Sequence, residues 1–262
     1  MKRGRIAYQG AIHEVTQAAD RRVRLADGRL LNESEVDWLP PVVAGTIFAL
    51  GLNYADHARE LAFKPPEVPL IFLKGPNTLI GHRAQTRRPA GATYMHYECE
   101  LAVVIGKTGY RVAKADALDL VAGYTVANDY AIRDYLENYY RPNLRVKNRD
   151  GCTPIGPWLV DRDDVADPMA LKLTTRVNDQ VTQQGTTADM IFDVATLIEY
   201  LSSFMTLNPG DIILTGTPEG LADVKVGDVV ETEIEGICSL QNTIVDDRRF
   251  FAHSEKREAR AA

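Results

Sequence analysis

The chain has 262 residues, of which 45% are hydrophobic and 25% charged, with a formal net charge of −6. This length and composition predict a folded protein with a sizeable core and argue against wholesale disorder. The acidic balance gives no reason to expect a nucleic-acid partner. The N-terminus is basic but lacks an apolar stretch behind it, and the longest apolar run, residues 42–52, is too short to span a bilayer. We therefore expect a cytoplasmic protein with no membrane association.

The first part of the chain carries a strand pattern. Residues 1–38 alternate weakly between apolar and polar side chains, and Asp27-Gly28 is typical of a hairpin turn. The two prolines at 40 and 41 end regular structure. We predict a small N-terminal β region over residues 1–41, a large domain over 42–250 and a charged tail over 251–262.

The large domain is predicted to be rich in strands. Helical spacing is confined to three segments, at residues 53–63, 114–123 and 187–205. Apolar runs bounded by turn residues predict strands near residues 42–52, 69–75, 96–106, 124–130, 157–160, 171–179, 211–217, 228–236 and 239–245. Strands do not alternate regularly with long helices, which argues against a doubly wound sheet. The predicted class is mainly β with short helices (α+β).

Three carboxylates lie at the ends of apolar strands. Glu98 and Glu100 precede the run 101–105, and Asp129 follows the run 124–127. On a strand, side chains two residues apart share a face, so the two glutamates face the same way and Cys99 points into apolar packing. Two such charges either remain in water at a solvated strand end or surround a hard divalent cation. The spacing alone leaves both readings open.

Five motifs in order carry a resemblance to a known family. ALGLNYADHARE, ECE, VANDYAIRD, KNRDGCTPIGPW and ILTGTPEG, spread over residues 42–245, resemble the fumarylacetoacetate hydrolase family. The resemblance implies a mixed β-sandwich roll for the catalytic domain, with a homodimer as the assembly. It also implies a Mg²⁺ or Mn²⁺ site with Glu98, Glu100 and Asp129 as ligands.

A finer resemblance points to one branch of that family. The stretches at residues 49–81, 128–151 and 183–192 are similar to the isomerase/decarboxylase enzymes of 4-hydroxyphenylacetate (homoprotocatechuate) degradation. That similarity implies decarboxylation of 5-oxopent-3-ene-1,2,5-tricarboxylate and isomerisation of 2-hydroxyhepta-2,4-diene-1,7-dioate. The substrate would be a small 2-oxo di- or tricarboxylate. Two alternatives stay open: a C–C bond hydrolase of acylpyruvates or fumarylacetoacetate-type compounds, and a non-catalytic metal- or carboxylate-binding protein.

The resemblance also assigns four catalytic residues. His57 and Glu60, at i and i+3 of an expected helix, would form an acid–base dyad, whereas without the family they would be a surface ion pair. Lys147 would neutralise the substrate or the carboxylates, and Asp150 would hold Lys147. The alternative for this second pair is a solvated basic loop.

Substrate contacts are expected from six further residues. A substrate with several carboxylates needs cations besides the metal, and arginine binds carboxylates with two parallel donors. The candidates are Lys74, Arg133, Tyr139, Arg141, Gln184 and Thr217.

Overall fold

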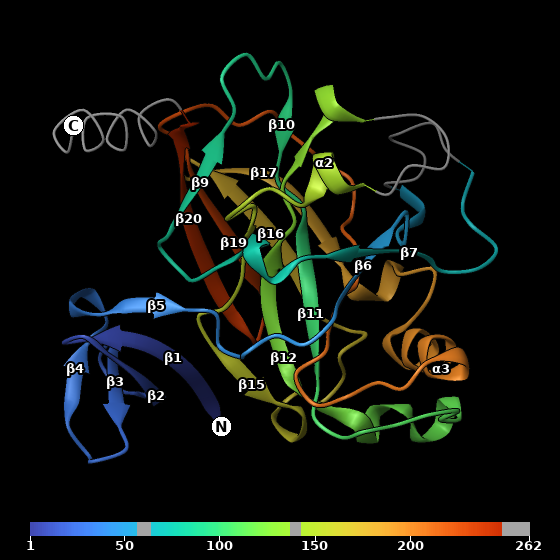
Figure 1. Ribbon diagram of the computed structural model, residues 1–262, viewed down its shortest axis with the longest axis horizontal. Helices are drawn as coiled ribbons and strands as arrows, with labels where there is room; N and C mark the ends of the chain where they lie inside the picture. Colours follow the sequence, from blue (N-terminus) through green and yellow to red (C-terminus); the bar gives the residue numbers. More distant parts are fainter. Residues whose placement is uncertain (57–63, 137–142, 248–262) are drawn as a thin grey trace, which may run out of the picture.

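The computed structural model describes residues 1–56, 64–136 and 143–247. Two large β-sheets form most of the molecule, with helical segments at its edges (Figure 1). The predicted class, mainly β with short helices, is confirmed. The predicted tail, residues 251–262, lies outside the described residues, and the domain boundary near residue 41 stays a prediction.

The larger sheet runs through the whole molecule. Within the described residues it contains eleven strands, in the order β4 (Leu30–Asn32), β3 (Arg22–Leu25), β2 (Ala11–Ala18), β1 (Lys2–Tyr8), β15 (Leu159–Asp161), β12 (Val121–Asn128), β11 (Cys99–Ile105), β18 (Ile212–Leu214), β6 (Ile47–Gly51) and β7 (Leu70–Lys74), with β5 (Asp37–Leu39) beside β1. Most neighbours are antiparallel, but β18 and β6 run parallel, so the sheet is mixed.

A second sheet packs against the centre of the first. Its order is β17 (Gln180–Thr186), β16 (Lys172–Val177), β19 (Val229–Ile234), β20 (Cys238–Asp246) and β9 (Gln85–Arg88). Two small ribbons complete the β structure: β10 (Met95–His96) with β13 (Ala131–Ile132), and β14 (Thr153–Pro154) with β8 (Leu79–Ile80). The first of these ribbons borders the site described below.

The central strand β11 is buried on both faces. Its odd-numbered side chains, Leu101 and Val103 among them, belong to a core shared with the second sheet and a helix. Ala102, on the other face, packs in a separate cluster with Ile155 and Leu214. The alternation expected from the sequence therefore assigns each side chain of β11 to one of two distinct environments.

The helices are short. Within the described residues they comprise α2 (Leu144–Lys147), α3 (Val194–Phe204) and the 3₁₀ turns Glu33–Glu35, Pro76–Thr78, Lys114–Leu120, Arg133–Tyr135, Arg162–Asp164 and Thr187–Asp189. The helix expected over 187–205 begins only at Val194, because the Asp193 side chain accepts a hydrogen bond from the Thr196 amide and caps the helix there. The helix expected over 114–123 is a 3₁₀ segment that gives way to β12 at Val121.

The N-terminal strands form a lobe that is joined to the rest by strand pairing. β1 pairs with β15, so the lobe continues the large sheet (Figure 1). The lobe also has a small core of its own, in which Trp38 packs edge-on against Trp158 at a centroid distance of 4.8 Å. Among the described segments, no helix is both long and apolar enough to cross a membrane.

Asp211 connects the two parallel strands at the centre of the large sheet. Its carboxylate accepts hydrogen bonds from the amides of Thr46 (2.7 Å) and Asn208 (2.8 Å), next to the starts of β6 and β18. We expect Asp211→Ala to lower the free energy of unfolding by about 2–4 kcal/mol, because two backbone amides lose a charged acceptor. Asp211→Asn, which keeps one acceptor oxygen, should cost about half as much. Urea unfolding of both variants checks this order, and equal losses would contradict it.

Candidate metal centre and active site

Three buried carboxylates meet at one point of the fold. One carboxylate oxygen from each of Glu98, Glu100 and Asp129 lies within 4.8 Å of the other two. All three side chains are buried, and Glu100 and Asp129 are fully so. The structure therefore contradicts a solvated strand end and brings together the three residues that the sequence suggested.

The pairing of β11 with β12 explains how these side chains meet. The two strands are antiparallel, so the start of β11 lies beside the end of β12, with Cys99 opposite Asn128. The Asp129 amide donates to the Glu98 carbonyl oxygen at 2.9 Å and extends the pairing by one step. Cys99 lies on the opposite face in the apolar core, as the alternation predicts, and burial raises the pKa of its thiol well above the usual value.

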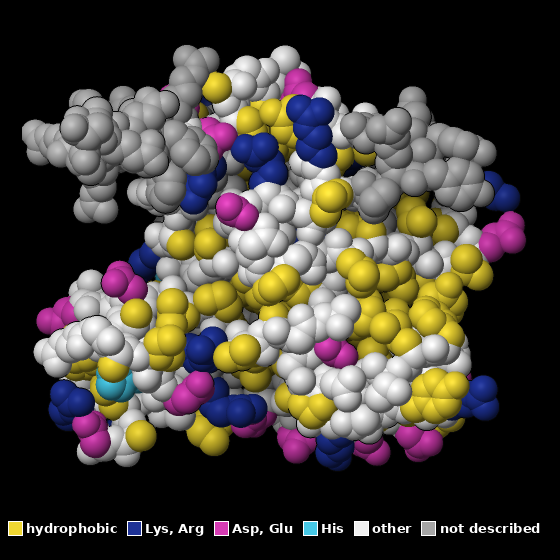
Figure 2. Space-filling view, in the orientation of Figure 1, with side chains coloured by type: hydrophobic (Ala, Val, Ile, Leu, Met, Phe, Trp, Pro, Cys, Tyr) yellow, Lys and Arg dark blue, Asp and Glu magenta, His cyan; other side chains and the backbone are white. Residues whose placement is uncertain are grey.

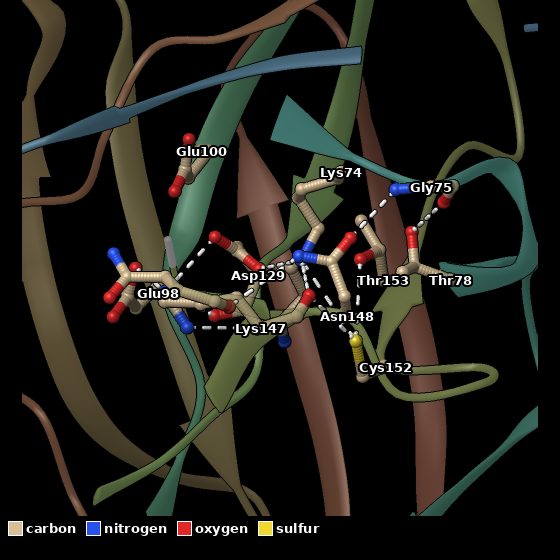
Figure 3. Close-up of polar contacts among 12 residues, drawn as sticks. Lys74, Gly75, Thr78, Glu98, Glu100, Asp129, Lys147, Asn148, Cys152 and Thr153 are labelled. Atoms are coloured by element: carbon tan, nitrogen blue, oxygen red, sulfur yellow. Dashed lines mark hydrogen bonds and ion pairs between the residues drawn. The ribbon is translucent and has the colours of Figure 1, made fainter. Parts of the chain in front are cut away.

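Two lysines lie among the carboxylates (Figure 3). Lys147, at the end of α2, donates to Glu98 Oε2 at 2.5 Å and to Asp129 Oδ2 at 3.0 Å. Lys74, at the end of β7, donates to Asp129 Oδ1 at 2.6 Å and to the carbonyl oxygen of Lys147. Burial disfavours the charged form of Lys147, but the charges of Asp129, Glu98 and Glu100 outweigh it and hold the pKa of this lysine above its usual range.

Glu100 is the carboxylate that these cations satisfy least. Its Oε2 accepts a hydrogen bond from the Gly216 amide at 2.7 Å, whereas its buried Oε1 has no hydrogen-bond partner among the described residues. Burial, and then the charges of Asp129 and Glu98, raise the pKa of Glu100 well above its ordinary value. A buried oxygen without a partner, beside two further carboxylates, is the donor set that a hard divalent cation takes. The triad therefore fits a divalent metal ion.

Polar side chains from other elements hold this arrangement in place. The Asn128 side chain accepts from the Glu98 amide at 2.9 Å and donates to Thr232 of the second sheet at 3.0 Å. Gly216 has a φ of +89°, and a Cβ there would lie 3.0 Å from the Cβ of Asn53, so glycine is required. Asn128 was not among the predicted site residues. The feature of the sequence that could have indicated it is its place as a polar residue at the end of an apolar strand.

A pocket of about 310 Å³ opens beside the triad. Glu98, Lys147, Arg133 and Thr217 line it together with Asn143, while the apolar part of its wall comes from Leu50, Leu52, Leu70, Phe72 and Leu136. Of the predicted substrate contacts, Arg133 and Thr217 thus lie at the pocket. Lys74 is not among the residues that line the pocket, and its ammonium group donates a hydrogen bond to Asp129.

Two predicted positions lie elsewhere. Asp150 does not hold Lys147: it is exposed and accepts a hydrogen bond from Asn77 at 2.7 Å, while the carboxylate partners of Lys147 are those of the triad. Gln184 is exposed, whereas its neighbour Gln183 is buried and donates to the Thr217 hydroxyl at 2.9 Å.

Four predicted residues lie outside the described part of the chain. His57, Glu60, Tyr139 and Arg141 fall in the segments 57–63 and 137–142. Their roles as acid–base dyad and substrate contacts stay predictions.

A comparison with family models identifies the chain. Residues 46–245 match the model described as fumarylacetoacetate (FAA) hydrolase C-terminal, and this range includes the triad, both lysines and the pocket. The chain belongs to the fumarylacetoacetate hydrolase family. The predicted family and fold are confirmed, and so is the prediction that the chain is an enzyme.

Individual members of the fumarylacetoacetate hydrolase family are similar over most of the chain. A 4-hydroxyphenylacetate degradation bifunctional isomerase/decarboxylase from Salmonella dublin is 60% identical over 221 residues, 84% of this chain and 51% of the relative. The protein of the same name from Escherichia coli is 64% identical over 203 residues, 78% of this chain and 47% of the relative. The chain thus spans about half the length of these curated relatives.

A solved structure of the family covers nearly the whole chain. The X-ray structure of 5-carboxymethyl-2-hydroxymuconate delta-isomerase from Mycobacterium smegmatis superposes with a TM-score of 0.84 at 38% identity, covering 94% of this chain and 99% of that one. The mixed β architecture seen here is therefore that of this enzyme family.

The unsatisfied oxygen of Glu100 predicts an unusual stability profile. Because the folded-state pKa lies above the ordinary 4.5, the stability that Glu100 contributes is fully present below pH 4.5 and is lost as the pH rises through the folded-state pKa. We expect Glu100→Gln to stabilise the metal-free protein by about 1–3 kcal/mol near neutral pH, and the gain to shrink on acidification. Thermal unfolding in a chelator at several pH values measures this.

A surface variant provides the control. Glu235→Gln, at a carboxylate whose side chain is 67% exposed, should leave stability unchanged across the same pH range. Added Mg²⁺ should raise the melting temperature of the wild type but not that of Glu100→Gln. A metal-free wild type that is more stable than Glu100→Gln at neutral pH would contradict the assignment.

Proposed function

We propose that the chain is a divalent-metal-dependent decarboxylase, with isomerase activity, of a 2-oxo di- or tricarboxylate in 4-hydroxyphenylacetate degradation. The expected compounds are 5-oxopent-3-ene-1,2,5-tricarboxylate and 2-hydroxyhepta-2,4-diene-1,7-dioate. The observation that carries the proposal is the buried carboxylate triad at a pocket that also presents Arg133 and Lys147. The names of the relatives and of the solved isomerase support the choice of reaction.

The triad would hold Mg²⁺ or Mn²⁺ through Glu98, Glu100 and Asp129. Such a cation supplies charge that stabilises an anion developing on a 2-oxo acid. Loss of CO₂ from a carbon conjugated to the ketone, and movement of a proton along the same chain, both develop that anion. One site can therefore serve decarboxylation and isomerisation.

The protein side chains prepare the pocket for this chemistry. Lys147 and Lys74 offset the negative charge of Glu98 and Asp129, so that an anionic substrate can approach. Leu70 and Phe72 form part of an apolar wall along which a conjugated carbon chain can lie. Arg133 offers its guanidinium to a second carboxylate.

A hydrolase of acylpyruvates or fumarylacetoacetate-type compounds is the second candidate. It would develop a similar anion but needs an activated water molecule. The predicted dyad His57–Glu60 would supply the base, so this alternative depends on residues outside the described part. A non-catalytic binding role is less consistent with the similar proteins that are named as isomerase/decarboxylase enzymes.

A parallel assay separates these functions. With Mg²⁺ or Mn²⁺ present, we expect the tricarboxylate to release CO₂ and the heptadienedioate to isomerise, while acetylpyruvate yields little pyruvate. Glu98→Ala, Glu100→Ala and Asp129→Ala should each lower turnover by at least about a hundredfold and weaken divalent-cation binding in calorimetry. Asp163→Ala, at an exposed carboxylate, is the control with wild-type values.

Two outcomes would refute the proposal. Pyruvate from acetylpyruvate with no CO₂ from the tricarboxylate would favour the hydrolase. Full activity in any one of the three triad variants would refute the metal centre itself.

We also infer a cytoplasmic homodimer. Figure 2 shows hydrophobic side chains gathered over the region where β6 and β7 lie in Figure 1. β7 ends the described order of the large sheet, and Leu70 and Leu73 on it are 52% and 60% exposed. Exposed apolar side chains on a terminal strand favour association of this kind. Light scattering should give twice the chain mass, and a monomer at micromolar concentration would contradict it.

A further inference from the structure

His96 is a buried histidine next to the active site that the proposed chemistry does not use. It lies on β10, two residues before Glu98, and is completely buried. Its Nε2 accepts a hydrogen bond from Arg133 Nε at 2.8 Å. Its Nδ1 lies 3.0 Å from the Tyr97 carbonyl oxygen and 3.6 Å from Glu98 Oε1.

These contacts determine which nitrogen of His96 carries the proton. A guanidinium has donors and no acceptor, so Nε2 must offer its lone pair to Arg133. Nδ1 then carries the hydrogen and donates it to the Tyr97 carbonyl oxygen. The ring in this arrangement is neutral, because an imidazolium has a hydrogen on both nitrogens and would have no lone pair for the Arg133 donor.

The backbone holds both partners of this hydrogen bond in register. In the ribbon of β10 and β13, His96 lies opposite Ala131, and the Arg133 amide donates to the Tyr94 carbonyl oxygen at 3.0 Å. The Asp134 carboxylate accepts from the amides of Thr93 and Tyr94, each at 3.0 Å. The base of the Arg133 side chain is thereby fixed relative to His96.

The bond from His96 restrains an arginine that lines the pocket. This hydrogen bond involves Nε of Arg133, whereas Nη1 and Nη2 of the same side chain have no hydrogen-bond partner among the described residues. These two nitrogens form the paired donor that binds a carboxylate. A free arginine side chain would lose rotamer freedom on binding, and the histidine removes much of that loss beforehand.

We propose that His96 is a positioning residue that orients Arg133 to bind a second carboxylate of the substrate at a set distance from the triad. It would thereby select 2-oxo acids with two carboxylates over those with one. The proposal rests on the proposed function for its substrate class, a 2-oxo acid held at the triad.

A matched pair of unreactive ligands tests the selection by binding alone. 2-Oxoheptanedioate has the chain length of the expected dioate, and 2-oxoheptanoate differs from it by a methyl group in place of the distal carboxylate. With Mg²⁺ present, calorimetry should show the wild-type protein preferring the diacid by about tenfold or more. Arg133→Met and His96→Leu should each remove most of that preference, whereas affinity for the monoacid should change little.

A double substitution separates positioning from a purely structural role. If His96 acts through Arg133, adding His96→Leu to Arg133→Met should cause no further loss of preference. His96→Gln places an amide oxygen near the position of Nε2 and should restore most of the preference. If His96→Leu does not fold, His96→Asn, whose amide oxygen falls short of Arg133, takes its place.

His82→Leu is the control for the loss of a half-buried histidine elsewhere in the fold. His82 is also neutral and accepts a backbone hydrogen bond, from the Gln241 amide, but it lies away from the pocket. Its substitution should lower thermal stability and leave the preference at the wild-type value.

Three results would overturn the positioning role. The first is equal affinity, or no affinity, of the wild type for the two ligands. The second is an equal loss of affinity for both ligands in His96→Leu. The third is a double variant in which the losses of diacid preference from the two substitutions add. An absence of CO₂ release from the tricarboxylate, with the diacid preference intact, would reject the proposed reaction and leave the role of His96 standing.

Discussion

The repulsion among three buried carboxylates is the constraint on which the rest of the site depends. Glu98, Glu100 and Asp129 bring up to three negative charges into a region from which water is largely excluded. Like charges this close, and this poorly hydrated, disfavour folding unless cations or protons compensate them. Lys74 and Lys147 supply two positive charges, both directed at Asp129, and one of them also at Glu98. Within the described part of the chain, Oε1 of Glu100 has no hydrogen-bond partner, so a proton or a metal ion is needed to compensate the charge of this carboxylate.

The sheet makes this concentration of charge possible because its strands have two distinct faces. On β11, Cys99 and Leu101 face the apolar core shared with α3, while Glu100 faces the other way. The pairing with β12 then aligns Glu98 with Asp129 without any long loop. A charged site can therefore lie one residue away from a close-packed core, since alternation separates the two environments along one strand.

The same alternation explains which residues could be predicted from the sequence. The apolar run after Glu98 and Glu100 sets their common strand face, and the family resemblance adds Asp129 to the same site. The segment QVTQQGT of β17 has no apolar alternation to set its faces, and its pairing with β16 shifts register between Thr175 and Arg176. The local sequence therefore does not distinguish Gln184, which is exposed, from Gln183, which is buried. Such a shift depends on the partner strand, and the local sequence does not contain it.

The loop residues were harder to predict for a similar reason. The family resemblance implied that Asp150 holds Lys147, but α2 ends at Lys147 and Asp150 accepts a hydrogen bond from Asn77 at the surface. The partners of Lys147 instead come from β11 and β12, which are distant in the sequence. Long-range ion pairs of this kind follow from topology, and sequence spacing gives little information about them.

The concentration of negative charge at the triad also explains why a histidine, and not a carboxylate, accepts the hydrogen bond from Arg133. A carboxylate partner would orient the guanidinium equally well, but it would neutralise the charge needed to attract a substrate carboxylate and would add a fourth acid next to the triad. A neutral imidazole accepts the Nε hydrogen bond and leaves the positive charge of Arg133 uncompensated by that contact. His96 is completely buried, and its hydrogen bonds to the Tyr97 carbonyl oxygen and to Arg133 fix the ring in this orientation. The exclusion of water therefore has two effects on the site. It makes a compensating cation necessary at the carboxylates, and it favours the neutral form of the histidine that accepts the hydrogen bond from Arg133.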